Sequence, residues 1–167
     1  MTITQFEKLL QEYGSSIYGF CCHLTGNRMA AEDLYQDAVL KAFSKLQTIR
    51  SEDKARNYIL GIAVRLYKNQ RRKHTETPAS DQLVPVPDMQ NVAEETEQQE
   101  LYACVRRAVQ GLPHRLREVT YLYYFSGLRT KEIVAVLHIP EGTVKSRLSK
   151  ARSEIRKEMV DHGYETR

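Results

Sequence analysis

The residue types most often used in metal or redox chemistry form one short cluster, Cys21-Cys22-His23, and a third cysteine stands apart at Cys104. A zinc site needs about four ligands, usually as spaced pairs, and the second pair is absent. Two small buried side chains on one helix are the expected interpretation of Cys21 and Cys22. The five histidines are scattered, and no phosphate-binding glycine loop or nucleophile–base pair is present. We therefore expect no metal, no cofactor, no catalytic residue and no enzymatic activity.

A second group of functional side chains, polar and cationic, lies between residues 141 and 152. Val144, Leu148 and Ala151 recur there with helical spacing and Ile155 extends the row, so one side of a helix is expected to be buried. The other side then carries Thr143, Lys145, Ser146, Arg147, Lys150 and Arg152. Such a helix has the charge and the shape that the major groove of DNA admits. An exposed basic face without a ligand is the alternative.

The residues before this helix predict how its start is positioned. A short helix is expected over residues 130–137, with Thr130 as its cap and its apolar side facing inward. His138-Ile139-Pro140 then forms a tight turn, because proline presets the backbone for the first turn of a helix. The second helix follows over residues 141–161. This arrangement predicts a helix-turn-helix within residues 112–156 whose second helix binds in the major groove of DNA.

A third group of side chains is acidic and polar, and consists of Glu32, Asp33, Gln36 and Asp37. Their spacing places them on one face of a helix, opposite Val39 and Phe43. DNA phosphates would repel such a face, so a protein partner explains it better. Ordinary solvated helix surface is the alternative.

These groups must be positioned by helices, because apolar residues recur with helical spacing and no stretch alternates as a strand does. Before residue 74 we expect one helix ending at Thr25-Gly26-Asn27, a second over residues 28–45 and a third over residues 55–73. The apolar row expected to face inward on the second helix is Tyr35, Val39, Ala42, Phe43 and Leu46. Helical spacing resumes at Leu101, and a further helix is expected over residues 113–124.

Charge and proline separate two blocks of helices. Residues 1–74 carry a net charge of +5, residues 75–100 a net charge of −7, and residues 101–167 a net charge of +6. Three of the five prolines fall between residues 78 and 87. We expect an all-α protein of two small helical domains, residues 1–74 and 95–162, joined by a flexible acidic linker over residues 75–94.

Length and hydropathy limit where such a chain can act. Its 167 residues suffice for one ordinary domain or two small ones. No apolar run reaches the roughly 18 residues of a membrane span, and no secretory signal opens the chain. A cytoplasmic location with reduced cysteines is expected.

Several short motifs resemble those of a known family. The C-terminal ones are Leu112-Pro113, Arg117-Glu118-Val119, Gly127-Leu128, Glu132-Ile133 and the run from Ile139 to Leu148. They resemble region 4 of the extracytoplasmic-function (ECF) sigma factors, group 4 of the sigma-70 superfamily. Leu24-Thr25-Gly26-Asn27 and the run from Ala31 to Asp37 resemble region 2 of the same family. The resemblance covers both helical blocks and leaves out the linker.

The resemblance implies that region 4 reads the duplex −35 promoter element. Lys145, Ser146 and Lys150 would then contact base edges. Arg147 and Arg152 would contact phosphates, and Thr143 belongs to the same surface. In region 2, the face formed by Glu32, Asp33, Gln36 and Asp37 would dock on the clamp helices of the largest subunit of core RNA polymerase.

The third helix would contact the single-stranded −10 element. Its candidate residues are Arg56, Tyr58, Arg65, Lys68, Asn69 and Arg72. Tyr58 stands where the family usually has tryptophan, and Arg65 where it has the asparagine that holds a flipped base. Asn69 keeps the second matching position, and residues 48–56 would complete the pocket. Tyr58 as an ordinary core residue is the alternative to base stacking.

The function implied is that of an alternative sigma factor, which directs bacterial RNA polymerase to promoters in response to stress or envelope signals. An anti-sigma factor, in this family often bound to the membrane, is the expected regulator. The 19 residues from Thr75 to Ala93 can extend to about 63–68 Å. A promoter spacer of about 16–17 base pairs spans about 55–58 Å, so the linker can just bridge both elements. A stand-alone helix-turn-helix repressor or activator is the alternative.

Overall fold

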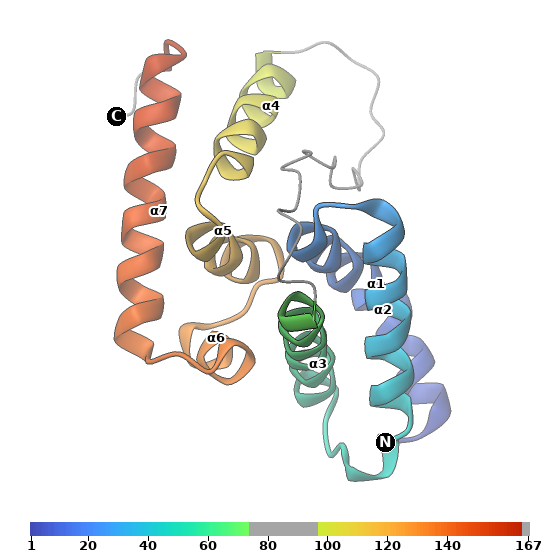
Figure 1. The fold of residues 1–167 in the computed structure, drawn as a ribbon. Helices are drawn as coiled ribbons and strands as arrows, with labels where there is room; N and C mark the ends of the chain where they lie inside the picture. Colours follow the sequence, from blue (N-terminus) through green and yellow to red (C-terminus); the bar gives the residue numbers. More distant parts are fainter. Residues whose placement is uncertain (74–96, 165–167) are drawn as a thin grey trace. The chain divides into compact units, whose positions relative to one another are not determined.

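The computed structural model describes residues 1–73 and 97–164, and within these ranges every regular element is a helix (Figure 1). In chain order the elements are α1 (Ile3–Thr25), α2 (Arg28–Phe43), η1 (Leu46–Thr48), α3 (Glu52–Lys73), α4 (Glu97–Gln110), α5 (His114–Thr120), η2 (Tyr121–Phe125), α6 (Thr130–Leu137) and α7 (Glu141–Asp161). The expected all-α fold class is confirmed. The linker expected over residues 75–94 lies outside the described residues.

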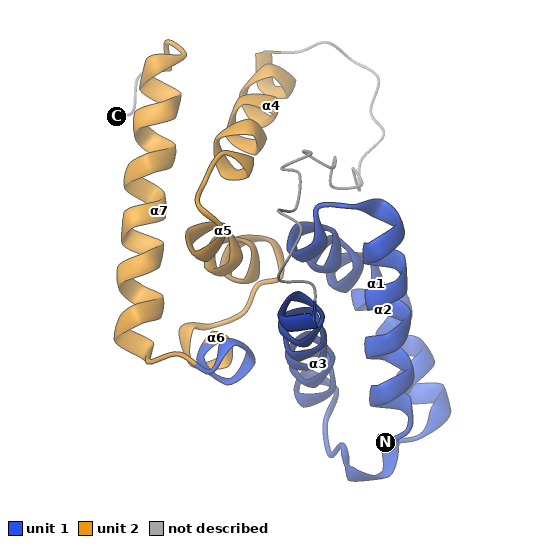
Figure 2. Ribbon diagram, in the orientation of Figure 1, with its two compact units in different colours: residues 1–87, 134–138 blue, residues 88–133, 139–167 orange. Residues whose placement is uncertain are grey.

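Two compact units divide the chain (Figure 2). The first comprises residues 1–87 with 134–138, and the second comprises residues 88–133 with 139–167. The division passes through α6, whose first four residues group with the second unit. The domain boundaries proposed from the sequence, at residues 74 and 95, remain a proposal.

Helices α1 and α2 begin and end at side chains suited to those places. Thr2 caps α1, because its hydroxyl oxygen accepts the Gln5 backbone N–H at 3.2 Å while the Gln5 side chain accepts the Thr2 N–H at 2.9 Å. Gly26 ends α1 with a φ of 63°, a conformation that costs glycine little. Asn27 then caps α2 by accepting the Ala30 N–H at 3.1 Å. The helix end predicted at residues 25–27 is confirmed.

The core of the first unit forms where α1, α2 and α3 pack against one another. Its fully buried large side chains are Leu9, Ile17, Phe20, Leu34, Ile59 and Leu60. Cys21 and Cys22 are buried there, and burial raises the pKa of the Cys21 thiol to about 12, so it stays protonated. The expectation of small buried side chains at both positions is confirmed.

The inward side of α2 was predicted correctly at Ala42, which is buried, and wrongly at Val39 and Phe43, which do not lie opposite the acidic residues. Leu34 and Ala38 are buried, whereas Phe43 is 44% exposed and Val39 is only half-buried. Apolar residues lie almost all the way round this helix, so spacing alone does not distinguish its two sides. The contacts with α1 and α3 select the Leu34 side.

In the second unit, α7 packs against α4 and α5. Leu112, Leu116 and Ala151 form a buried cluster that Ile155 covers. The helix expected over residues 113–124 is instead α5 followed by a π-helical turn, in which the Ser126 N–H donates to the Tyr121 carbonyl at 3.0 Å. Within this turn the rings of Tyr121 and Phe125 stack, with their centroids 5.1 Å apart.

Helices α6 and α7 have the bounds predicted for them, residues 130–137 and 141–161. Pro140 precedes α7 with a φ of −60°, and its carbonyl accepts the N–H groups of Thr143 and Val144. His138 takes up the chain reversal after α6 with a φ of 55°. No helix among the described residues is long and apolar enough to cross a membrane.

Candidate nucleic-acid interface

The outward side of α7 carries the polar residues predicted to bind DNA. Val144, Leu148 and Ala151 are buried, as expected from their spacing. Lys145, Ser146, Lys150 and Arg152 are exposed, and Thr143 and Arg147 are half-buried. All six candidate residues therefore lie on one helix with its apolar row turned inward. The Ser146 hydroxyl donates to the Thr143 carbonyl at 3.1 Å.

The starts of α6 and α7 are joined by side chains. Thr130 does not cap α6 as predicted, because α6 begins at Thr130 itself and its hydroxyl donates to Glu141 Oε1 at 3.1 Å. The cap comes from Glu132, whose Oε2 accepts the Arg129 backbone N–H at 2.7 Å. Glu141 Oε1 also lies 3.7 Å from Lys145 Nζ.

Arg152 is held against the π-helical turn. Its Nε donates to the Tyr124 hydroxyl oxygen at 2.6 Å, and its guanidinium lies 5.8 Å from the ring centroids of both Tyr123 and Tyr124. A guanidinium has five N–H donors, so this one bond leaves others able to reach a phosphate. The sequence did not indicate this contact, since 28 residues separate the two partners.

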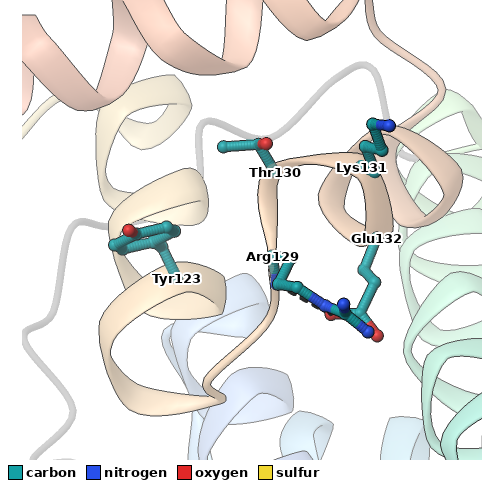
Figure 3. Close-up of a pocket in the computed structure, with 5 residues that line it drawn as sticks. All are labelled: Tyr123, Arg129, Thr130, Lys131 and Glu132. Carbon is teal, nitrogen blue, oxygen red and sulfur yellow. Dashed lines mark hydrogen bonds and ion pairs between the residues drawn. The ribbon is translucent and has the colours of Figure 1, made fainter.

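An open groove of about 590 Å³ lies beside these residues in the second unit. Tyr123 forms one side of it, and residues 129–132 form the other (Figure 3). The guanidinium of Arg129 points toward the Glu132 carboxylate, with Nε 3.7 Å from Oε2. Arg129 and Lys131 were not predicted as DNA contacts. The sequence signal that points to these two residues is a pair of cations at a helix N-terminus, where the helix dipole disfavours positive charge.

The acidic face of α2 is exposed in the first unit. Glu32, Asp33, Gln36 and Asp37 all face solvent, and Glu32 Oε1 lies 3.3 Å from the Nε of Arg28. Met29 and Leu40, 74% and 65% exposed, continue the same side of the helix at either end. The acidic row therefore has an exposed apolar side chain near each end, which a protein partner would cover. The sequence prediction had missed these two residues.

Five of the six candidate residues on α3 form an exposed surface. Tyr58, Arg65, Asn69 and Arg72 follow one another at helical spacing on one side, and Lys68 lies next to them. Tyr58 is 39% exposed, so the alternative of an ordinary core residue is wrong. Gly61 lies in the same row, and a Cβ added to it would meet no atom within 4 Å.

Arg56 does not join this surface. It is half-buried, and its guanidinium lies 4.8 Å from the ring centroid of Tyr13 on α1. A cation held over an aromatic face braces α3 against α1. The placement of Arg56 gives it a structural contact that the sequence prediction did not include.

Family models match both units. Residues 9–77 match the sigma-70 region 2 model, and residues 102–155 match the sigma-70 region 4 model. The two matched segments together cover well over half of the chain. They include α2 and α3 in the first segment and the whole of α6 in the second.

Related proteins agree over nearly the full length. The ECF RNA polymerase sigma factor SigW of Bacillus subtilis is 28% identical over 93% of this chain and 89% of its own. The RNA polymerase sigma-H factor of Pseudomonas aeruginosa is 26% identical over 91% of this chain and 84% of its own. This chain belongs to the ECF group of the sigma-70 family. The resemblance stated from its motifs is thereby confirmed.

Solved structures share the fold of this sigma factor. The sigma factor RpoE of Bartonella quintana, solved with the anti-sigma factor NepR, has a TM-score of 0.73 and 22% identity, with 95% of this chain and 98% of that chain covered. CnrH, solved with the cytosolic domain of CnrY, has a TM-score of 0.62 and 18% identity, with coverage of 95% and 89%. These likenesses concern whole chains, and the roles of individual residues remain predictions.

Proposed function

We propose that this chain is an alternative sigma factor that binds core RNA polymerase, brings it to specific promoters and helps to open them, while the polymerase performs the chemistry. The observation that carries the proposal is the start of α7. There a helix with a buried apolar row presents Lys145, Ser146 and Lys150 to solvent directly after a short helix and a tight turn.

We propose that the second unit binds the duplex −35 element. Lys145, Ser146 and Lys150 would contact base edges, because they extend from the outward side of α7. Arg147 and Arg152 would contact phosphates, and Thr143 would lie at the edge of the DNA major groove. The groove beside Arg129 and Lys131 supports a second line of phosphate contacts.

The first unit would bind both the polymerase and the opened −10 element. The α2 face of Glu32, Asp33, Gln36 and Asp37 is proposed to bind the polymerase, with Met29 and Leu40 adding apolar contact. The exposed ring of Tyr58 can stack on a base, and Arg65, Lys68, Asn69 and Arg72 can follow the strand. Arg56 would act by bracing α3 through Tyr13.

An anti-sigma factor is the proposed regulator, and the cytoplasm the proposed location. Support for the regulator comes from the RpoE and CnrH relatives, solved with NepR and with the cytosolic domain of CnrY. An anti-sigma factor anchored in the membrane but exposing a cytosolic domain could reach this chain there.

Transcription in vitro tests the proposal. The purified chain is mixed with core RNA polymerase and genomic fragments of its source, and start sites are mapped. We expect start sites that share two elements and are lost when either component is omitted. Tight binding of the chain alone to duplex DNA, with no new start sites on adding polymerase, would instead show a stand-alone repressor or activator.

A further inference from the structure

Glu141 places a negative charge in the first turn of α7, at the end that we propose to contact DNA. Four cations lie near it in the sequence, Arg129, Lys131, Lys145 and Arg147. A carboxylate among them weakens attraction to DNA phosphates of any sequence. Its contacts indicate what this charge provides in return.

The Glu141 carboxylate restrains Lys145. Its Oε1 lies 3.7 Å from Lys145 Nζ, with the glutamate four residues before the lysine, which is the favourable order. A solvent-exposed pair of this kind adds little to folding stability. Its larger effect is on the position of the ammonium group, which otherwise moves on a flexible four-carbon stem.

Thr130 in turn restrains the carboxylate. The Thr130 hydroxyl donates to the same Oε1 at 3.1 Å, from a residue 11 positions earlier and on the neighbouring helix. The bond is part-buried, and the Glu141 side chain is 39% exposed where that of Lys145 is 66% exposed. The oxygen that attracts Lys145 on α7 is therefore also held by a hydrogen bond from α6, which restricts where the ammonium group can pair with it.

We propose that Glu141 is a positioning residue for DNA recognition, which acts through Lys145. It raises discrimination between bases at the base pair that Lys145 contacts, and it lowers the affinity for DNA of any sequence. The proposal rests on the proposed function, since it takes Lys145 to read a base. A positioned ammonium donates to a guanine acceptor at one place, whereas a free one can move to a neighbouring base or a phosphate.

The test is selection of promoters by the full chain bound to core polymerase. The probe is a pool of duplexes randomised across the −35 element, and the selected sequences are compared between the native chain and Glu141→Gln. We expect preference at one base pair to fall about threefold or more, while retention on an unrelated duplex rises about two- to fivefold. Glu154→Gln removes an equal charge from an exposed residue of α7 and should leave base preference unchanged.

A second pair of variants separates positioning from folding. In a Lys145→Ala background, adding Glu141→Gln should cause no further change in base preference, because the residue through which Glu141 acts is gone. Thr130→Val should give part of the Glu141→Gln effect. Unchanged preference in Glu141→Gln, or an equal change in the Lys145→Ala background, would overturn the proposal. Failure of the native chain to select any sequence would instead contradict the proposed function.

Discussion

Gly142 lies at the second position of α7, where an added Cβ would meet no atom of the protein within 4 Å. Alanine there should raise the free energy of unfolding by about 0.5–1 kcal/mol, because glycine loses more backbone freedom on folding. The same methyl group would lie where the bases of the DNA major groove approach the backbone of α7, so binding to the −35 element should weaken several-fold. Urea denaturation and promoter binding with polymerase measure the two effects.

The exposed residue Ser153 provides the control for Gly142. Ser153→Ala lies later on the same helix and should leave promoter binding unchanged. If Gly142→Ala stabilises the chain and binds promoters as tightly as before, DNA does not approach the backbone at this residue.

Gly61 on α3 also has room for an added Cβ, and it lies between Tyr58 and Arg65 on the side of α3 proposed to bind DNA. Gly61→Ala should raise the free energy of unfolding by about 1 kcal/mol, since the position is within a helix. If the −10 strand passes close to this backbone, promoter opening should fall, as followed by permanganate reactivity of unpaired thymines. Stabilisation together with normal opening would place the strand elsewhere.

At the scale of elements, the π-helical turn η2 and helix α7 are joined by Arg152 and Tyr124. Arg152→Met removes the 2.6 Å hydrogen bond and the contacts with two rings, so the free energy of unfolding should fall by about 1–2 kcal/mol. Tyr124→Phe keeps the ring and should cost about half as much. Equal stability of all three proteins in urea would show that this contact does not brace the two elements.

Helix α2 is the element proposed to bind polymerase. Reversing two of its exposed charges, Asp33→Lys with Asp37→Lys, should weaken binding to core polymerase at least about tenfold, since like charges across an interface cost several kcal/mol. Both carboxylates are exposed, so the thermal stability should change little. The double variant Glu7→Lys with Glu154→Lys is the control of equal charge change. Normal polymerase binding by the α2 variant would remove this face from the proposal.

Sequence patterns predicted elements best where a strong local signal marks each end. Thr25-Gly26-Asn27 correctly marked the end of α1 and Pro140 the start of α7, and the row of Val144, Leu148 and Ala151 predicted the buried side of α7. No one-sided apolar row exists in α2, whose apolar residues surround the helix, and there the prediction chose Phe43 instead of Leu34. The π-helical turn was not predicted either, because the spacing of apolar residues does not distinguish it from a turn of α-helix.

At the scale of the molecule, the candidate site shows the same difference between what local spacing predicts and what it does not. Residues on one helix, such as those of α7, can be placed together from spacing alone. Contacts between distant elements cannot, and two of these were not predicted: Arg56 meets Tyr13, and Arg152 meets Tyr124. Spacing also could not show that Thr130 bonds to Glu141 across the turn instead of capping its own helix.

The two proposed DNA surfaces lie in separate units, α3 in the first and α7 in the second, and one chain joins them. The 19 residues from Thr75 to Ala93 reach at most about 63–68 Å. Five base pairs added between the −35 and −10 elements turn them to opposite sides of the duplex, so transcription should fall at least about tenfold. Ten added base pairs restore the rotation but lengthen the spacer by about 34–36 Å, to about 89–94 Å in total. That length exceeds the reach of the linker, so transcription should not recover. Run-off transcription measures both, with the same insertions upstream of the −35 element as controls. Full recovery at ten base pairs would show that the linker does not limit the distance between the two contacts.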